Sequence, residues 1–420
     1  MHRKFVQFLF SCLIICCIQS NASEQTTDQI VASQTFDGRL LDTHVFKESI
    51  KLLNSREDII ERIPLEDTYD HNLIFVVQQR NLDELERVLH DVSDPASSDY
   101  GHHWSGEQIR ALTSNLEARD AIVTYLSANG ATVTSETLGG DFITANATLS
   151  TWRRMLNTEF FTFHQRQRNG DIHQLVRAHE YSIPRELESH IHHILNVIEL
   201  PVVSATGPTL LKRSPKRIVE SEKSGGFEES DVDLSGLLLP ANIREYYHLS
   251  DVYGNQQSTQ AIIGFNREYF SPNSLAYFQQ NMTSQPLQPA MTIGGYVSES
   301  PYVDCIESNL DVQYIMGISP RSPTTMFHAA GIVAWLLDNS DNIIPPLVQS
   351  VSYGAYESLI STGFHASVTT LAMKLGVMGV TLFAATGDDG AVSMDIHPCA
   401  YEPTFPAVNP YFTAVGATSV

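Results

Sequence analysis

Two acidic residues, Glu307 and Asp311, lie four positions apart in the segment Cys-Ile-Glu-Ser-Asn-Leu-Asp-Val-Gln-Tyr. Apolar residues at 306, 310 and 314, with Val312, Ile315 and Met316 beside them, predict a largely buried helix here, and residues i and i+4 of a helix share one face, one turn apart. Like charges at this spacing repel each other, and partial burial favours the neutral form of a carboxyl group. Such a carboxyl group can act as a general acid or base at acidic pH. The spacing therefore indicates acid–base chemistry, and the alternative is a solvated acidic helix face.

A third acidic residue, Asp388, stands in the segment Thr386-Gly-Asp-Asp-Gly, directly after the apolar residues 380–385. Ligand sites of parallel α/β sheets lie at the carboxyl ends of the strands. If residues 380–385 form such a strand, Asp388 lies at a functional edge. The alternative is that Asp388 only stabilises the turn.

The residues after Leu237 alternate between apolar strands and helices, which predicts a parallel α/β sheet. The predicted strands are 260–265, 348–353, 380–385 and 411–415. The predicted helices, besides the acidic one, are 243–248, a helix that begins at Ser271-Pro272, 328–337 and 365–378.

Residues 72–201 are predicted to form a separate, compact α+β unit. Its predicted helices are 82–92, 105–112, 116–129 and 149–156, and its predicted strands are 73–78, 132–136, 141–146 and 159–165. A polar stretch from 203 to 236 follows, with the basic pairs Lys212-Arg213 and Lys216-Arg217. We expect an exposed linker that is easily nicked, and the basic pairs are either processing sites or part of a plain charged linker.

The first 22 residues predict export from the cytosol. A basic start is followed by the apolar run 5–18 and by small residues at 20 and 22, which is the pattern of a secretory signal peptide cleaved after Ala22. The apolar run is shorter than a membrane-spanning helix requires. We expect a soluble protein of an extracellular or lysosome-like compartment.

Two cysteines, Cys305 and Cys399, remain once the signal peptide is removed. An even pair in an oxidising compartment predicts a disulfide, and the alternative is two buried free thiols. Asn146 and Asn281 begin N-x-Thr sequences and are candidate glycosylation sites. The formal net charge of −22 argues against nucleic acid as a partner, because phosphate binding requires a basic surface.

Five segments, in the same order along the chain, resemble those of the sedolisin family of serine-carboxyl peptidases. Glu307-Ser-Asn-Leu-Asp311-Val-Gln-Tyr resembles its E-x-x-x-D helix, Val351-Ser-Tyr-Gly its cleft strand, and Thr386-Gly-Asp388-Asp-Gly its S-G-D-x-G turn, with Thr386 in place of the usual Ser. Residues 403–407 and 414–419 resemble the P-x-F-P-A and V-G-G-T-S segments. Upstream, residues 93–101 resemble part of an activation propeptide of the pro-kumamolisin type.

The resemblance implies an α/β, subtilisin-like peptidase domain preceded by a ferredoxin-like α+β propeptide. The expected domains are a signal peptide (1–22), an activation propeptide (23–202), a linker (203–236) and the N-terminal part of the peptidase domain (237–420). The propeptide is expected to inhibit the peptidase domain intramolecularly, and the substrates are expected to be peptides or unfolded proteins at acid pH. Removal of tripeptides and internal cleavage both stay open from the sequence.

By the same resemblance, Glu307 is the general base for a serine, Asp311 orients Glu307, and Asp388 donates a hydrogen bond to the developing oxyanion. Ser352, Tyr353 and Gly354 line the substrate cleft. The family's nucleophilic serine and its calcium site come from segments that are expected beyond Val420, so neither is assigned within residues 1–420. Ser419 matches the earlier V-G-G-T-S strand and is not assigned as the nucleophile.

Two other functions stay open from the sequence. The first is a catalytically inactive binding or inhibitory protein that retains the propeptide and half of a cleft. A glycosidase that uses the two carboxylates is less consistent with the sequence, because one helical turn fixes both groups on one element and no aromatic sugar platform is evident.

Histidine is concentrated in the predicted propeptide, since twelve of the sixteen histidines precede residue 204. The clusters are His102-His103, His190 and His192-His193. Histidine gains charge between about pH 5 and pH 8. Acidification is therefore expected to charge the propeptide and loosen it from the peptidase domain, and scattered surface histidines are the alternative.

Overall fold

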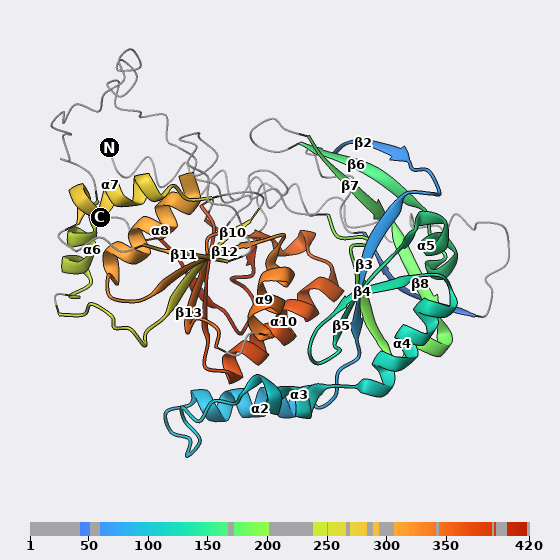
Figure 1. Cartoon of the computed structure of the whole chain (residues 1–420), viewed down its shortest axis with the longest axis horizontal. Helices are drawn as coiled ribbons and strands as arrows, with labels where there is room; N and C mark the ends of the chain where they lie inside the picture. Colours follow the sequence, from blue (N-terminus) through green and yellow to red (C-terminus); the bar gives the residue numbers. More distant parts are fainter. Residues whose placement is uncertain are drawn as a thin grey trace, which may run out of the picture.

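The computed structural model describes residues 43–50, 59–166, 172–200, 238–249, 251–265, 269–283, 289–293, 306–341, 344–388, 390–391 and 401–417. Two parts lie side by side, one built from residues before 201 and the other from residues after 237 (Figure 1). The predicted linker 203–236 lies outside the described residues.

The first part is built on a four-stranded antiparallel sheet in the spatial order β4-β5-β3-β9. Its strands are β3 (Asp70–Val77), β4 (Thr132–Glu136), β5 (Phe142–Thr148) and β9 (Ile191–Leu195). Its helices are α2 (Leu82–Ser93), α3 (Gly106–Thr113), α4 (Leu116–Ala128) and α5 (Leu149–Leu156). Helices separate β3 from β4 and β5 from β9, so the chain follows the split β-α-β-β-α-β path of a ferredoxin-like fold.

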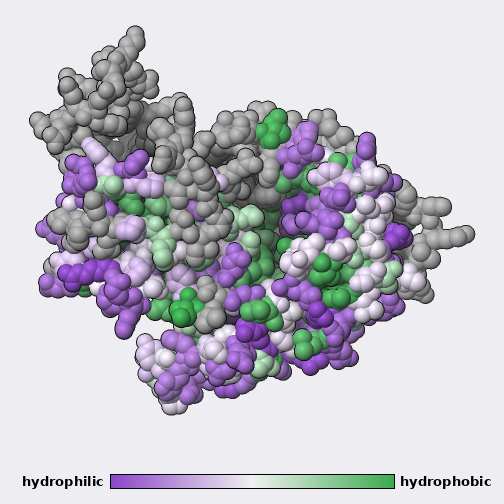
Figure 2. All heavy atoms as spheres, in the orientation of Figure 1, coloured by the Kyte–Doolittle hydropathy of each residue, from purple (hydrophilic) through white to green (hydrophobic). Residues whose placement is uncertain are grey.

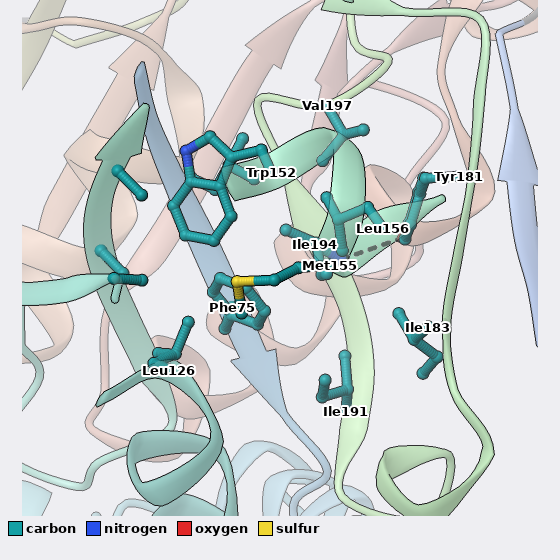
Figure 3. Packing of buried hydrophobic residues seen from close by; sticks show 14 of the residues in the cluster. Phe75, Leu126, Trp152, Met155, Leu156, Tyr181, Ile183, Ile191, Ile194 and Val197 are labelled. Atoms are coloured by element: carbon teal, nitrogen blue, oxygen red, sulfur yellow. Dashed lines mark hydrogen bonds between the residues drawn. The ribbon is translucent and has the colours of Figure 1, made fainter. Parts of the chain in front are cut away.

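Burial of large side chains between this sheet and α4 and α5 holds the first part together (Figure 3). Trp152 is fully buried, packs against Phe75 and donates from its indole nitrogen to the carbonyl oxygen of His71 at 2.9 Å. The buried hydroxyl of Tyr181 accepts the backbone N–H of Ile194 at 3.0 Å. Burial of each such side chain stabilises the fold by about 2 kcal/mol. The indole N–H of Trp152 and the hydroxyl of Tyr181 keep hydrogen-bond partners in the core.

The first part also contains two smaller antiparallel sheets. One has the order β2-β6-β7 and the other pairs β1 with β8. Their strands are β1 (His44–Ser49), β2 (Ile59–Pro64), β6 (Phe160–Arg166), β7 (Ile172–Ala178) and β8 (Glu180–Pro184), and the short helix η2 (Arg185–Leu187) follows β8.

The second part is built on a six-stranded parallel sheet in the order β11-β12-β10-β13-β15-β17. Its strands are β10 (Gln260–Phe265), β11 (Met291–Ile293), β12 (Thr324–Ala329), β13 (Val348–Val351), β15 (Thr381–Ala385) and β17 (Thr413–Val415). Its helices are α6 (Pro240–Tyr246), α7 (Pro272–Met282), α8 (Ile306–Ile318), α9 (Ile332–Ser340) and α10 (Thr362–Val377). The pair β14 (Ala355–Tyr356) and β16 (Thr404–Phe405) and the short helix η4 (Glu357–Leu359) complete it.

Helices cover both faces of the parallel sheet. Ile262 of β10 packs with α7 and α8, whereas its neighbours Ala261 and Ile263 pack with α9 and α10. Successive side chains of a strand point to opposite faces, so the two helix pairs lie on opposite sides. The predicted α/β and α+β architectures are both confirmed.

The structure corrects one predicted helix and adds a central strand. Residues 328 and 329 end strand β12, so the helix predicted over 328–337 begins only at Ile332. The preceding segment Thr-Thr-Met-Phe-His-Ala has β-branched and aromatic residues that favour a strand, and it is hydrogen-bonded between β10 and β11.

Helix α10 joins the two parts. On one side it packs with the parallel sheet, and on the other it contacts α2, α3 and β9 of the first part. Figure 1 shows α2 and α3 reaching beneath the second part. Buried leucines and valines of α2 pack against Met373 and Val377. The backbone N–H of Trp104 donates to the carbonyl oxygen of Val377 at 3.0 Å.

Candidate functional site

Helix α8 carries the predicted acidic pair on the flank of its buried stripe. Ser308, Val312 and Met316 are the buried residues that follow one another at i, i+4 and i+8. Glu307 and Asp311 precede the first two by one position and are half-buried. The carboxylates therefore share one face, as predicted, at the boundary between the core and the solvent.

The prediction of a largely buried α8 was wrong in detail. Ile306 and Leu310 are 40% and 43% exposed. The sheet lies against the stripe that contains Val312 and Met316, which pack with Ile262 and Met326. The sequence prediction included residues of both stripes, which have the same four-residue period, and only the stripe of Val312 and Met316 is buried.

The end of β13 meets the acidic face of α8. Ser352 follows Val351, the last residue of β13, and its hydroxyl donates to Oδ1 of Asp311 at 2.9 Å. Both side chains are half-buried. Two predicted site segments, 41 positions apart in the sequence, are thereby in direct contact at the carboxyl edge of the sheet.

The rest of the predicted cleft segment is held by close packing. The ring of Tyr353 meets that of Phe265 edge to face, with 5.2 Å between the ring centroids. A Cβ on Gly354 would lie 2.5 Å from a methyl carbon of Thr404 and 2.8 Å from the carbonyl oxygen of Phe405. Only glycine fits at position 354 without a shift of the backbone at 404–405.

Asp388 lies at the same edge, after the neighbouring strand β15, and is exposed. Thr386 anchors the start of this turn, because its backbone N–H and its hydroxyl donate to the carbonyl oxygen of Val415 at 3.0 and 3.2 Å. Gly387 has a φ of 89°, which glycine adopts readily. Asp388 thus lies exposed in a turn that Thr386 ties to the end of β17 (Thr413–Val415).

The other predicted sites are placed only in part. Cys305, Cys399 and Ser419 lie outside the described residues. Asn281 is exposed near the end of α7, and its amide donates to the carbonyl oxygen of Tyr277 at 2.8 Å. Asn146 is half-buried on β5 and donates to the amide oxygen of Asn72 at 2.8 Å. Glycosylation of either residue stays a prediction.

The described ranges contain no group of three or more His, Cys, Asp and Glu side chains arranged to hold a metal ion. The calcium that the family resemblance implies therefore stays an expectation. Within the same ranges, no helix is long and apolar enough to cross a bilayer.

A buried ion pair between the two parts was not predicted from the sequence. Lys374 of α10 donates to Asp141, which precedes β5, and their side chains are only 7% and 9% exposed. Burial by itself would raise the pKa of Asp141, but the Lys374 ammonium and the hydrogen bonds from Lys374 and Thr137 outweigh it and hold that pKa below its usual range. A lysine within the apolar run of α10 was the signal available in the sequence.

Comparison with known proteins agrees with the motifs. Residues 58–200 match the family described as Pro-kumamolisin, activation domain. Tripeptidyl-peptidase 1 of Dictyostelium discoideum is 31% identical over 379 residues, which are 82% of this chain and 61% of that protein. Tripeptidyl-peptidase 1 of Homo sapiens is 28% identical over 362 residues, 83% of this chain and 61% of that protein.

Among solved structures, a Pseudomonas sedolisin, a serine-carboxyl proteinase, overlaps with a TM-score of 0.34 at 22% identity, over 42% of this chain and 52% of that chain. By the family match, residues 58–200 are similar to pro-kumamolisin activation domains. The relatives extend the similarity across both parts of the fold, so the resemblance to sedolisin-type peptidases that the motifs predicted is confirmed. The chain spans 61% of the length of these relatives.

Proposed function

We propose that this chain is the zymogen region of a serine-type, acid-acting sedolisin-like peptidase. The observation that carries the proposal is the contact between the E-x-x-x-D helix and the cleft strand, through Asp311 and Ser352, at the carboxyl edge of a parallel sheet. In α/β sheets this edge is where ligands bind. The motif order and the activation domain supply the class of chemistry.

The residues have complementary roles in this proposal. Glu307 accepts the hydroxyl proton of the nucleophilic serine that the family resemblance implies, while that oxygen attacks the peptide carbonyl carbon. Glu307 then returns the proton to the leaving amine, and water releases the acyl group by the same two proton transfers. Asp311 orients Glu307, and Asp388 donates a hydrogen bond to the oxyanion. A carboxyl group can donate only when it is protonated, which is consistent with work in an acidic medium.

The first part of the fold acts as an intramolecular inhibitor in this proposal. We assign 1–22 as signal peptide, 23–202 as activation propeptide, 203–236 as linker and 237–420 as peptidase domain, in a secreted or lysosome-like protein. The support is the way in which the activation domain covers α10, through buried apolar side chains, the Asp141–Lys374 pair and β9.

Histidines at this junction support acid-dependent release of the propeptide. His193 of β9 is buried, its ring packs on Gly363, and its Nε2 lies 3.0 Å from the hydroxyl of Ser367 on α10. Burial lowers the pKa of His193 well below its usual range, and the neighbouring His192 and Lys47 lower it further. His193 is therefore neutral in the docked state, and released propeptide takes up the proton more readily.

The test is to acidify the complete gene product and follow the propeptide by mass spectrometry and the cleavage of peptide substrates. We expect cleavage within 203–236 and peptidase activity. In Glu307→Gln the activity should fall by roughly 10²- to 10⁴-fold, because a general base is lost. Peptides with free and with blocked amino termini distinguish tripeptide removal from internal cleavage. An acid-treated protein that binds peptides without cleaving them would support the binding or inhibitory alternative.

A further inference from the structure

The contact between Ser352 and Asp311 assigns a role to a side chain that the motifs place only in the substrate cleft. We propose that Ser352 is a positioning residue for the catalytic carboxylates, which acts through Asp311 and not through the substrate. This inference rests on the proposed peptidase function. It adds a fourth residue to the arrangement of Glu307, Asp311 and the serine.

The geometry fixes the Asp311 carboxyl group from outside its own helix. The Ser352 hydroxyl has one proton, and it donates that proton to Oδ1 of Asp311 at 2.9 Å. Holding one oxygen restricts rotation of the carboxyl plane, and so sets the direction of Oδ2. Glu307 lies one turn away on the same face, where an oriented Asp311 can act on it.

The strand that carries Ser352 is a rigid support. Strand β13 lies inside the sheet, between β10 and β15, and Val351 is buried. Two residues further on, Gly354 is packed against Thr404 and Phe405. A hydroxyl held on such an element is positioned within a narrow range, as orientation of a catalytic group requires.

The same contact commits the Ser352 hydroxyl proton within the protein. The backbone groups of segment 352–354, which lines the cleft in the proposed function, survive replacement of the Ser352 side chain. Loss of the hydroxyl is expected to affect the turnover step more than substrate binding. The inference thus predicts a change in kcat with little change in KM.

The hydrogen bond also bears on the pH dependence of turnover. A donor that faces a carboxylate favours its charged form, so its removal makes protonation easier. Among the described residues, the titratable groups at this edge of the sheet include Glu307 on α8, His328 near the end of β12, Tyr269 against the ring of His328, and Asp388 after β15. They stay unchanged in a Ser352 variant, so a shift in the acidic limb of kcat reports the lost donor.

The experiment measures kcat and KM against pH for the acid-activated complete gene product and for Ser352→Ala. We expect kcat to fall about tenfold, the value of one hydrogen bond to a charged group. The acidic limb should move up by about one pH unit, and KM should change by less than about twofold. Ser358→Ala is the matched control, because its hydroxyl also donates to a carboxylate, that of Glu402, at 2.9 Å.

A second pair of variants separates the hydroxyl from packing. Thr and Val have nearly the same shape and differ in the hydroxyl group, so Ser352→Thr should retain most of kcat and Ser352→Val should lose it. Equal kcat in the two variants, or a Ser352→Ala profile that matches wild type, would overturn the inference while leaving the peptidase proposal intact. Wild-type protein without peptidase activity would overturn both.

Discussion

The junction at α10 and the carboxyl edge of the parallel sheet use polar groups in opposite ways. At the junction three polar groups are almost fully buried: Lys374, Asp141 and His193 are all less than 10% exposed. At the sheet edge Asp311 and Ser352 are half-buried, Glu307 likewise, and Asp388 is exposed. The junction excludes the charges of Lys374 and Asp141 and the ring of His193 from water, whereas the carboxylates at the sheet edge are in contact with water.

This difference separates two effects of acid on one molecule. A buried neutral histidine destabilises the junction when it gains an unpaired charge, which begins as pH falls below about 6.5. The buried ion pair is lost only when Asp141 takes up a proton, and its lowered pKa places that step below the usual range of an aspartate. Half-buried carboxyl groups can take up and release protons at much lower cost. Acid is therefore expected to weaken the junction while leaving the acidic site able to work.

The ends of α10 reinforce the junction. The carboxylate of Glu48 accepts the backbone N–H groups of Thr362 at 2.6 Å and of Gly363 at 3.3 Å, at the positive end of the helix dipole. Lys374 lies in the last turn, where a cation is favoured. Both partners, Glu48 and Asp141, come from the first part of the fold, so undocking leaves both helix ends without them.

Loss of the buried ion pair is expected to have the largest effect on the junction. Lys374→Met leaves Asp141 buried without its cation and should destabilise the protein by about 3–5 kcal/mol, measured by urea unfolding at neutral pH. The double variant with Asp141→Asn tests whether the cost comes from the uncompensated charge. It should be more stable than the sum of the single effects predicts, and strictly additive losses would contradict the pairing.

A smaller effect is expected where the backbone of α10 meets the ring of His193. A Cβ at position 363 would lie 2.5 Å from Cδ2 of that ring. Gly363→Ala should therefore destabilise the docked protein by about 1–3 kcal/mol through overpacking, and release the propeptide at a higher pH. Gly331→Ala is the control, because its Cβ would meet nothing within 4 Å. Identical release profiles for the two variants would refute close packing at the junction.

The smallest change concerns the charge on His193 itself. The docked state holds the pKa of His193 below the ordinary 6.5, so docking is favoured above about pH 6.5 and this contribution is lost as pH falls below it. His193→Gln removes the imidazole ring that takes up this proton, so the pH at which the propeptide is released should fall by roughly half to one unit.

The comparison for His193→Gln is His102→Gln. The side chain of His102 is 76% exposed, and its Nδ1 lies 3.9 Å from Asp99. The His102→Gln substitution should therefore leave the pH of propeptide release unchanged. If both substitutions shifted the release pH equally, the total histidine charge of the propeptide, and not the buried residue, would control release.

Much of the fold could be predicted because local patterns and tertiary packing agree. The predicted strand 260–265 and helix 149–156 have the bounds of β10 and α5, since continuous apolar residues and a Thr148 cap define them locally. Strand β9 was missed: Ile-His-His-Ile-Leu has no turn signal, and it becomes a strand by pairing with β3. Pairing between distant segments cannot be read from one of them.

The same distinction between local pattern and long-range contact applies to the candidate site. Sequence alone identified the acidic pair and its spacing, the predicted cleft segment, the turn around Asp388 and the resemblance to sedolisin-type peptidases, because these depend on residue types and order along the chain. Only the tertiary structure decided that Ser352 faces Asp311, that α8 buries the stripe of Val312 and not that of Leu310, and that Lys374 pairs with Asp141. Those contacts join residues far apart in the chain, and the packing of whole elements selects them.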